Sequence, residues 1–446
     1  MNDTPLAVHS NWDVPLVSLE DEQHFETLNG LWKGKKEPLI EAGVIRNTNF
    51  TSAGVIDYSK VAWLDVEQSK LVKRQLQFGD IILERSGGGP KQPVGRVVYF
   101  GRQDGVFSFS NFTSAIRVRH HDKFLPKFVF YALMQLYQSG GTEDLQRRTT
   151  GIRNLDFAAY KRRACVPELP LEEQKKIAHV LSMVQRAIES QERIIQTTTE
   201  LKKALMHKLF TEGLHNGRQK QTEIGPVPES WDVVELGKFL QIKHGFAFNG
   251  KLFRPSGKFV LMTPGNFNEE GGFRDQGEKT KYFVGDFPRE YLLHKDDLLV
   301  AMTEQKSGLL GSAAFVPQSE MYLHNQRLGL IVELDERRLS KRFLFHLFNT
   351  PHLRIEVAKT ATGSKVKHTS PGRLRSVKVA IPPTLDEQEE IAFALNVTER
   401  RSETARRNAS NLRVLFGCLL NNLISGHISA RDIKPRHEAT AGRACN

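Results

Sequence analysis

The fold of this chain is decided by the stretch Leu171-Glu172-Glu173-Gln174-Lys175-Lys176-Ile177-Ala178, which returns as Leu385-Asp386-Glu387-Gln388-Glu389-Glu390-Ile391-Ala392. A second repeated word, Trp12-Asp13-Val14 and later Trp231-Asp232-Val233, precedes the two stretches at nearly the same spacing. Internal similarity over so long a period is typical of a duplicated domain and not of a solenoid unit. The sequence therefore predicts two modules that share one architecture.

Each copy of the stretch opens a long segment without glycine or proline that we predict to be helical. The first seam has apolar residues at alternating steps of four and three, as in a coiled coil: Ile177, Leu181, Val184, Ile188 and Ile195. The second segment keeps this spacing, but its strongly apolar half lies at its C-terminal end, so the seams match best if the helices are antiparallel. At 1.5 Å per residue, each helix would span about 60 Å. The alternative is that each helix is an ordinary amphipathic helix packed on its own module.

Six short runs rich in β-branched or aromatic residues are predicted to be strands. They are 80–83, 97–100 and 115–118 in the first module, and 298–300, 313–316 and 330–332 in the second. The ranges 128–137 and 343–348 are more helical, so the predicted class is α+β, with two similar domains joined by two long antiparallel helices and related by a pseudo-two-fold repeat. The expected boundaries are 1–168 for the first module, 169–213 for the first long helix, 214–228 for a linker, 229–383 for the second module, 384–427 for the second long helix and 428–446 for a C-terminal tail.

Composition favours an acidic partner and a reducing compartment. The chain has 446 residues, a net charge of +12 and a pI near 9.5, with basic residues in both modules. Its three cysteines, Cys165, Cys418 and Cys445, are too scattered for a disulfide framework or a CxxC zinc site. The sequence has no apolar run as long as a membrane span and begins without the pattern of a secretory signal, so we expect a cytoplasmic protein.

The order of these features resembles the specificity subunit of Type I restriction-modification systems, from about Trp12 to about Ile428, including the entry Val227-Pro228-Glu229-Ser230-Trp231-Asp232-Val233. The resemblance implies two target recognition domains that each read one half of a split DNA sequence, and long helices that set their separation and dock methyltransferase subunits. The implied partners are double-stranded DNA, two methyltransferase subunits that carry S-adenosylmethionine, and restriction subunits that use ATP and Mg. It implies no cofactor or metal site in this chain. The second helix departs from the pattern in its middle, where basic residues are crowded: Arg400, Arg401, Arg406 and Arg407.

Known catalytic motifs are not found in the sequence. Resemblance to adenine methyltransferases would require Asn or Asp before Pro-Pro and an aromatic residue after it, whereas Pro382-Pro383 lies between Ile381 and Thr384. The glycine cluster Gly87-Gly88-Gly89-Pro90-Lys91 lacks the spacing of a phosphate-binding P-loop and is predicted to be a flexible loop. We therefore expect a non-catalytic subunit with no catalytic residues and no metal ligands.

The predicted functional residues are DNA contacts in polar loops. Arg and Lys neutralise phosphates, whereas Arg, Asn and Gln at base edges can discriminate between bases. The candidates in the first module are Arg46, Asn47, Asn49, Arg85, Lys91, Gln92, Arg96, Arg147, Arg148, Arg153 and Asn154. Those in the second module are Asn266, Gln305, Lys306, Lys365, Lys367, His368 and Arg373. The alternative for each single residue is a solvated surface side chain.

Taken together, the sequence favours a subunit that binds duplex DNA at two unlike half-sites separated by an unread spacer. If both modules approach one face of the duplex, the half-sites would lie about 10 bp apart, centre to centre. A coiled-coil scaffold whose basic modules bind RNA or protein is the competing hypothesis, and it predicts no sequence-specific duplex binding. A fragment of a fused methyltransferase is a third hypothesis, although this sequence begins directly with a recognition module.

Overall fold

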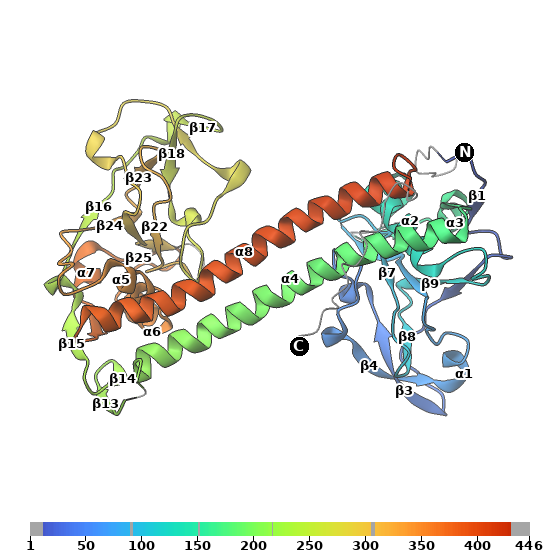
Figure 1. The fold of residues 1–446 in the computed structure, drawn as a ribbon, viewed down its shortest axis with the longest axis horizontal. Coiled ribbons are helices and arrows are strands. Elements are labelled where there is room, and N and C mark those ends of the chain that lie inside the picture. The colour runs from blue at the N-terminus through green and yellow to red at the C-terminus, as the bar shows by residue number, and fades with distance from the viewer. Residues whose placement is uncertain (1–11, 90–91, 150–151, 216, 305–307, 430–446) are drawn as a thin grey trace, which may run out of the picture. The chain divides into compact units, whose positions relative to one another are not determined.

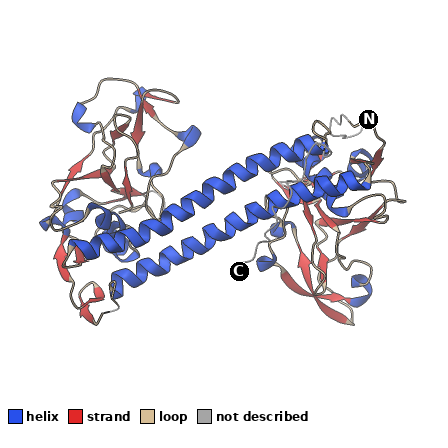
Figure 2. Cartoon of the chain, in the orientation of Figure 1, coloured by secondary structure: helices blue, strands red, loops and turns tan. Residues whose placement is uncertain are grey.

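The computed structural model describes residues 12–89, 92–149, 152–215, 217–304 and 308–429, which form two compact units. Unit 1 comprises the chain up to Glu192 and from Arg407 onward, and unit 2 comprises the residues between them. Each unit combines strands with helices, which confirms the predicted α+β class (Figure 1 and Figure 2). Among the described residues, no helix is sufficiently long and apolar to span a membrane.

Unit 1 is built on a four-stranded antiparallel sheet covered by α2 (Pro126–Gln138). In order across this sheet the strands are β2 (Phe25–Asn29), β9 (Thr113–Val118), β5 (Ile81–Glu84) and β7 (Val97–Tyr99). Three predicted strands and the predicted helix of this module are thus confirmed. Strand β1 (Leu16–Ser18) pairs with β12 (Cys165–Pro167). Two three-stranded sheets have the orders β4 (Ala62–Glu67), β3 (Leu39–Ile45), β8 (Phe107–Phe109) and β10 (Gln146–Thr149), β11 (Ile152–Leu155), β6 (Ser86–Gly88). The unit also contains the short helices α1 (Gln68–Leu71) and α3 (Phe157–Arg163).

Unit 2 has a central sheet with the same strand order, covered by α5 (Lys341–Phe348). Its strands are β16 (Gln241–His244), β24 (Leu328–Val332), β20 (Leu298–Ala301) and β22 (Ala313–Phe315). Three strand pairs accompany this sheet: β15 (Asp232–Glu235) with β26 (Lys378–Ile381), β21 (Thr303–Glu304) with β25 (Lys367–His368), and β13 (Gln219–Thr222) with β14 (Gly225–Pro228). A second four-stranded sheet has the order β17 (Phe253–Arg254), β19 (Tyr282–Phe283), β18 (Phe259–Met262), β23 (Tyr322–His324). The unit also contains the helices α6 (Pro351–Lys359) and α7 (Pro371–Arg375).

Two long helices, α4 (Leu171–Glu212) and α8 (Leu385–Ile424), pack against each other within each unit (Figure 1). In unit 1 Glu192 pairs with Arg413 at 2.6 Å, while the earlier Glu173 accepts a hydrogen bond from Ser429, beyond α8. In unit 2 Lys202 pairs with Glu399 at 3.1 Å. Residues later in α4 therefore contact residues earlier in α8. This direction agrees with the antiparallel seam predicted from the sequence.

The repeated tryptophan lies at the C-terminal end of a long helix in both units. The indole Nε1 of Trp12 donates to the carbonyl of Ile424, the last residue of α8, at 2.9 Å. The buried Trp231 packs edge-on against Phe210 near the end of α4 and donates to Glu387 Oε1 at 3.0 Å. The two copies of the Trp-Asp-Val word thus fix the chain to the ends of the two helices.

The repeated glutamine of the opening stretch is a buried side chain that hydrogen-bonds three backbone groups from separate segments, an arrangement that we call a clamp. Gln174 is fully buried, and its Oε1 accepts a hydrogen bond from the backbone N–H of Leu125 at 2.8 Å. Its Nε2 donates to the carbonyls of Lys123 and Leu169, both at 2.8 Å. Because Leu125 is the N-cap of α2, this one side chain joins α4, α2 and the proline-rich lead-in.

Gln388 makes the equivalent contacts in unit 2. Its Oε1 accepts from the N–H of Ser340, the N-cap of α5, at 2.8 Å. Its Nε2 donates to the carbonyls of Arg338 and Pro382 at 3.0 and 3.3 Å. A buried amide that satisfies three backbone groups explains why the Glu-Gln word occurs at both positions.

Two buried histidines of unit 2 are held in the neutral form. Nε2 of His346, in α5, lies 3.1 Å from Asn396 Oδ1 of α8, and Nε2 of His324 lies 2.9 Å from the carbonyl oxygen of Leu328. Burial lowers the pKa of His346 to about 3 and that of His324 to about 4, from an ordinary value of 6.5. Both folded-state pKa values therefore lie below the unfolded value.

This difference predicts that unit 2 loses stability in acid. The unfolded state binds more protons once the pH falls below 6.5, so the stabilising contribution is complete above that pH and is lost toward pH 4 for His324 and pH 3 for His346. We expect the free energy of unfolding to fall by about 1.4 kcal/mol per pH unit for each histidine. Urea unfolding between about pH 7 and about pH 5 measures this slope. His346→Gln should remove the contribution of that histidine to the slope, whereas His352→Gln, at an exposed position of α6, should leave the slope unchanged. Equal slopes for the wild type and His346→Gln would contradict the prediction.

Candidate nucleic-acid interface

In unit 1 a three-stranded ribbon brings together predicted contacts that are far apart in the sequence. Strand β11 lies between β6 and β10, with Asn154 opposite Ser86 on one side and opposite Arg147 on the other. Ser86 Oγ donates to Asn154 Oδ1 at 2.5 Å. Arg153 faces Arg148 across the β10–β11 pair. The ribbon therefore joins the basic loop before Leu155 to the glycine-rich segment after β5.

In unit 2 the shorter ribbon β21–β25 joins the corresponding segments. Thr303 lies opposite His368 and Glu304 opposite Lys367. Lys365, Lys367 and His368 are exposed. Three predicted contacts lie outside the described residues: Lys91 of the first module, and Gln305 and Lys306 of the second. The basic segment 365–368 thus lies beside the strand that leads into 305–306.

Arg373 is also exposed, at the end of the second module's basic segment. Its Nη1 donates to Thr362 Oγ1 at 3.1 Å, which ties α7 to the start of that segment. Because Arg373 is exposed and cationic, it fits an electrostatic contact with an anionic partner.

The buried carboxylate of Glu304 and the half-buried guanidinium of Arg354, both missed by the sequence prediction, hold the segment 308–310 in place. Glu304 Oε2 accepts hydrogen bonds from the N–H groups of Gly308, Leu309 and Leu310 at 2.9 to 3.0 Å. Arg354 of α6 donates to the carbonyl of Leu310 at 2.6 Å. Burial lowers the pKa of Arg354 to about 10. Glu304 and Arg354 therefore position the loop, a role that sequence spacing alone does not reveal.

Two predicted base-reading residues, Asn49 and Asn266, belong to the core instead. Both are buried, with exposed fractions of 0% and 2%. Asn49 Oδ1 accepts from the N–H of the half-buried Arg46 at 2.8 Å, and Asn266 Oδ1 accepts from the N–H of Thr263 at 2.9 Å. Each amide closes a 3-10 turn at an equivalent place in its unit. Their polar atoms are used inside the protein, which argues against both predicted DNA contacts.

Arg96 is likewise directed inward. It forms a two-point ion pair with Glu84, with N–O distances of 2.7 and 2.8 Å, and donates to the carbonyl of Asn47 at 3.2 Å. The amide of Asn47 donates to Glu84, and the amide of Gln92 lies against the same guanidinium. The Glu84 side chain is only 1% exposed. This network supports the loops from beneath, so Arg96 is a structural residue and not the predicted DNA contact.

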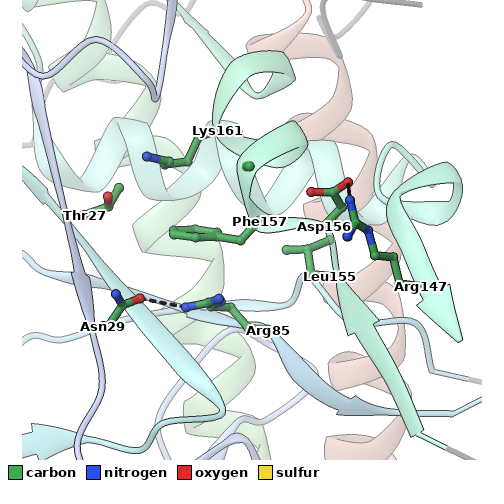
Figure 3. Close-up of a pocket in the computed structure, with 9 residues that line it drawn as sticks. Thr27, Asn29, Arg85, Arg147, Leu155, Asp156, Phe157 and Lys161 are labelled. Carbon is green, nitrogen blue, oxygen red and sulfur yellow. Dashed lines mark hydrogen bonds and ion pairs between the residues drawn. The ribbon is translucent and has the colours of Figure 1, made fainter. Parts of the chain in front are cut away.

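A pocket of about 480 Å³ lies between β2 and α3 in unit 1 (Figure 3). Its lining contains three cationic side chains and one carboxylate, that of Asp156, which is paired with Arg147. Arg85 donates through Nη1 to Asn29 Oδ1 at 2.7 Å, and its guanidinium lies 4.5 Å from the ring centroid of Phe157. Burial lowers the pKa of Arg85. The lining residues are Thr27, Asn29, Arg85, Arg147, Leu155, Asp156, Phe157, Ala158 and Lys161.

The geometry of these surfaces suits the binding of an anionic partner. Exposed guanidinium and ammonium groups gather at ribbons that end in loops, and the groups that fix those loops are buried beneath them. Within the described ranges, no group of three or more His, Cys, Asp or Glu side chains is arranged to hold a metal ion.

Comparison with known proteins finds similarity to Type I restriction-modification specificity subunits. Residues 228–410 match the model of the Type I restriction modification DNA specificity domain. Two specificity subunits of Methanocaldococcus jannaschii are similar along much of the chain. The MjaVIII subunit is 26% identical over 293 residues, covering 65% of this chain and 67% of that protein. The putative MjaX subunit is 24% identical over 390 residues, covering 84% of this chain and 85% of that protein.

A solved structure shares the fold as well. The S subunit of a Type I restriction-modification system from M. genitalium has a TM-score of 0.60 at 16% identity, covering 94% of this chain and 98% of that one. The family model and the two relatives agree with the order of motifs read from the sequence. Residues 228–410 thus match the Type I restriction modification DNA specificity domain, and the chain is similar to Type I restriction-modification specificity subunits over most of its length.

Proposed function

We propose that this chain reads a bipartite duplex DNA target, one half with each unit, and performs no catalysis itself. The proposal rests on one observation: the central sheet and the buried glutamine are the same in both units, whereas the basic residues of the ribbons are different. The central sheets have the same strand order, and the clamps Gln174 and Gln388 make the same contacts. At the ribbons, Arg147 and Arg153 of unit 1 contrast with Lys367 and His368 of unit 2. Two modules with one scaffold and unlike contact residues suit two unlike half-sites.

The proposed partners are two methyltransferase subunits, which would supply S-adenosylmethionine, and restriction subunits, which would supply ATP and Mg chemistry. We place the methyltransferase contacts on the long helices. In unit 2, Phe393 and Val397 of α8 are 70% and 49% exposed one turn apart. In unit 1, Val414 and Leu415 of α8 are 67% and 46% exposed. Large apolar side chains on a solvent-facing helix are typical of protein contact surfaces.

The test is methylation-sensitive sequencing of host DNA with this gene present and deleted, while the methyltransferase gene is left intact. We expect deletion to abolish adenine methylation at one split motif, whose two parts are the two half-sites. Complementation with the intact gene should restore the same motif. An unchanged methylation pattern, in cells shown to express the protein, would contradict the proposal and favour a scaffold that binds RNA or protein.

A further inference from the structure

Arg85 is a half-buried cation without an acidic partner. Two other partly buried arginines beside the central sheet of unit 1 have one: Arg96 pairs with Glu84 and Arg117 with Asp80. No ion pair joins Arg85 to a carboxylate of the described residues, and its side chain hydrogen bonds go to neutral groups. A charge removed from water without a counter-charge is unfavourable unless a ligand supplies acceptors. The uncompensated guanidinium borders the pocket of Figure 3.

The guanidinium is held in one orientation. Nη1 donates to Asn29 Oδ1 at 2.7 Å and to Ser114 Oγ at 3.2 Å, while the plane rests over the Phe157 ring. Arginine has five N–H donors, so the Nε and Nη2 groups remain for a ligand. A fixed, planar pair of donors suits two adjacent acceptors in one plane.

Two exposed aromatic residues are linked to Arg85 through the backbone of Phe112. The backbone carbonyl of Phe112 accepts from the N–H of Arg85 at 2.9 Å, which places the two residues side by side. Phe112 is 41% exposed and meets Trp32, 56% exposed, edge-on with ring centroids 6.3 Å apart. We call the set of Asn29, Trp32, Arg85, Phe112, Phe157 and Lys161 the Arg85 patch.

Backbone hydrogen bonds identify the equivalent positions in unit 2. The N–H of Met302 donates to the carbonyl of Arg327 at 2.9 Å, as that of Arg85 does to Phe112, so Met302 replaces Arg85. The N–H of Thr369 donates to the carbonyl of Met302, just as that of Leu155 donates to Arg85.

The other patch positions also differ between the units. Asn29 pairs with Ser114 in β2–β9, and His244 pairs with Gly329 at the same place in β16–β24. Phe157 follows the N-cap of α3, whereas Pro371 follows the N-cap of α7. The patch chemistry is therefore specific to unit 1, unlike the framework residues that recur in both units. Residues that differ on a shared scaffold are the ones that can distinguish two targets.

We propose that Arg85 reads a guanine in the half-site bound by unit 1, donating hydrogen bonds from Nε and Nη2 to O6 and N7 of the base. This inference rests on the proposed function. Bidentate contact with O6 and N7 is the commonest way in which arginine specifies a base in the major groove. Asn29 and Phe157 are positioning residues that fix the guanidinium plane. A bidentate phosphate contact could use the same donor pair, but it would carry no base preference, so sequencing of the methylated motif distinguishes the two.

The experiment compares the wild type with Arg85→Met, which installs the residue of unit 2, and Arg85→Lys, which keeps the charge but not the planar fork. Each is expressed with its methyltransferase partner, and the methylated motif is sequenced. We expect both variants to relax one G·C position of one half-site, with discrimination reduced about 10- to 100-fold. The other half-site should be unchanged, which also shows that the variant is folded. Arg102→Met is the control, because it removes a charge from unit 1 at an exposed pair with Asp104.

Two outcomes would overturn the inference. The first is an unchanged motif in both variants, and the second is a uniform loss of methylation with every base preference retained, as expected for a phosphate contact. Asn29→Ala provides an independent arm if the Arg85 variants do not fold, since it should relax the same position by loosening the guanidinium. The proposed function fails separately, if the wild type directs no methylation to a split motif.

Discussion

Replacing Gln388 by leucine should lower the free energy of unfolding of unit 2 by about 3 to 5 kcal/mol, because three buried backbone groups lose their partners at once. Leucine fills a similar volume but cannot bond the N–H of Ser340 or the carbonyls of Arg338 and Pro382. The loss can be measured by urea unfolding followed through the fluorescence of Trp231. Unit 2 has this single tryptophan among the 4 of the chain, so the other three are replaced by phenylalanine in all variants.

Two matched variants make this prediction specific. Gln174→Leu removes the equivalent hydrogen bonds and should destabilise unit 1 by a similar amount, which is followed by far-ultraviolet circular dichroism because Trp231 lies in unit 2. Gln196→Leu makes the same change at an exposed position of α4 and should alter the stability by less than about 0.5 kcal/mol. If Gln388→Leu cost no more than Gln196→Leu, the clamp would have no energetic role.

Arg96→Met should destabilise unit 1 by about 3 to 5 kcal/mol, since it leaves the buried Glu84 carboxylate without its cation. The Glu84 side chain is 1% exposed, and its other neighbour, Asn47, offers only a neutral amide. Urea unfolding of the variant measures the loss. The double variant Glu84→Gln with Arg96→Met removes both charges and should recover part of it. Arg102→Met breaks an exposed pair with Asp104 and should change the stability far less than Arg96→Met.

The same variants separate a structural role for Arg96 from a contact with DNA. Under the structural assignment, the double variant folds and directs methylation to the wild-type motif. A folded double variant that lost one base preference would return Arg96 to the set of DNA contacts. Arg96 and Arg85 both lie next to a short apolar strand in the sequence, but in the structure Arg96 bonds Glu84 and Arg85 bonds Asn29.

Much of the fold could be predicted from the sequence because it depends on local patterns that occur twice. The steps of four and three in the long helices are a property of helical periodicity, and the runs that became β5, β7 and β9 are apolar and bounded by turn residues. The positions of the seams along the two helices also indicated their antiparallel direction. The strands β3, β4 and β8 were not predicted, and the parallel pairing of the three-residue β8 with β3 joins segments far apart in the chain, which no local pattern indicates.

The sequence by itself thus determined the two-module plan, the α+β class and the long helices, since periodicity and repetition are readable without knowing what each residue touches. Only the tertiary structure decided which polar residues are available to a partner. Asn49, Arg96 and Arg85 all lie in polar loops, yet the first closes a buried turn, the second neutralises Glu84, and the third keeps donors free beside a pocket. The reason is that a polar side chain forms hydrogen bonds with the groups that the fold brings close to it. Those groups come from strands that are far apart in the sequence.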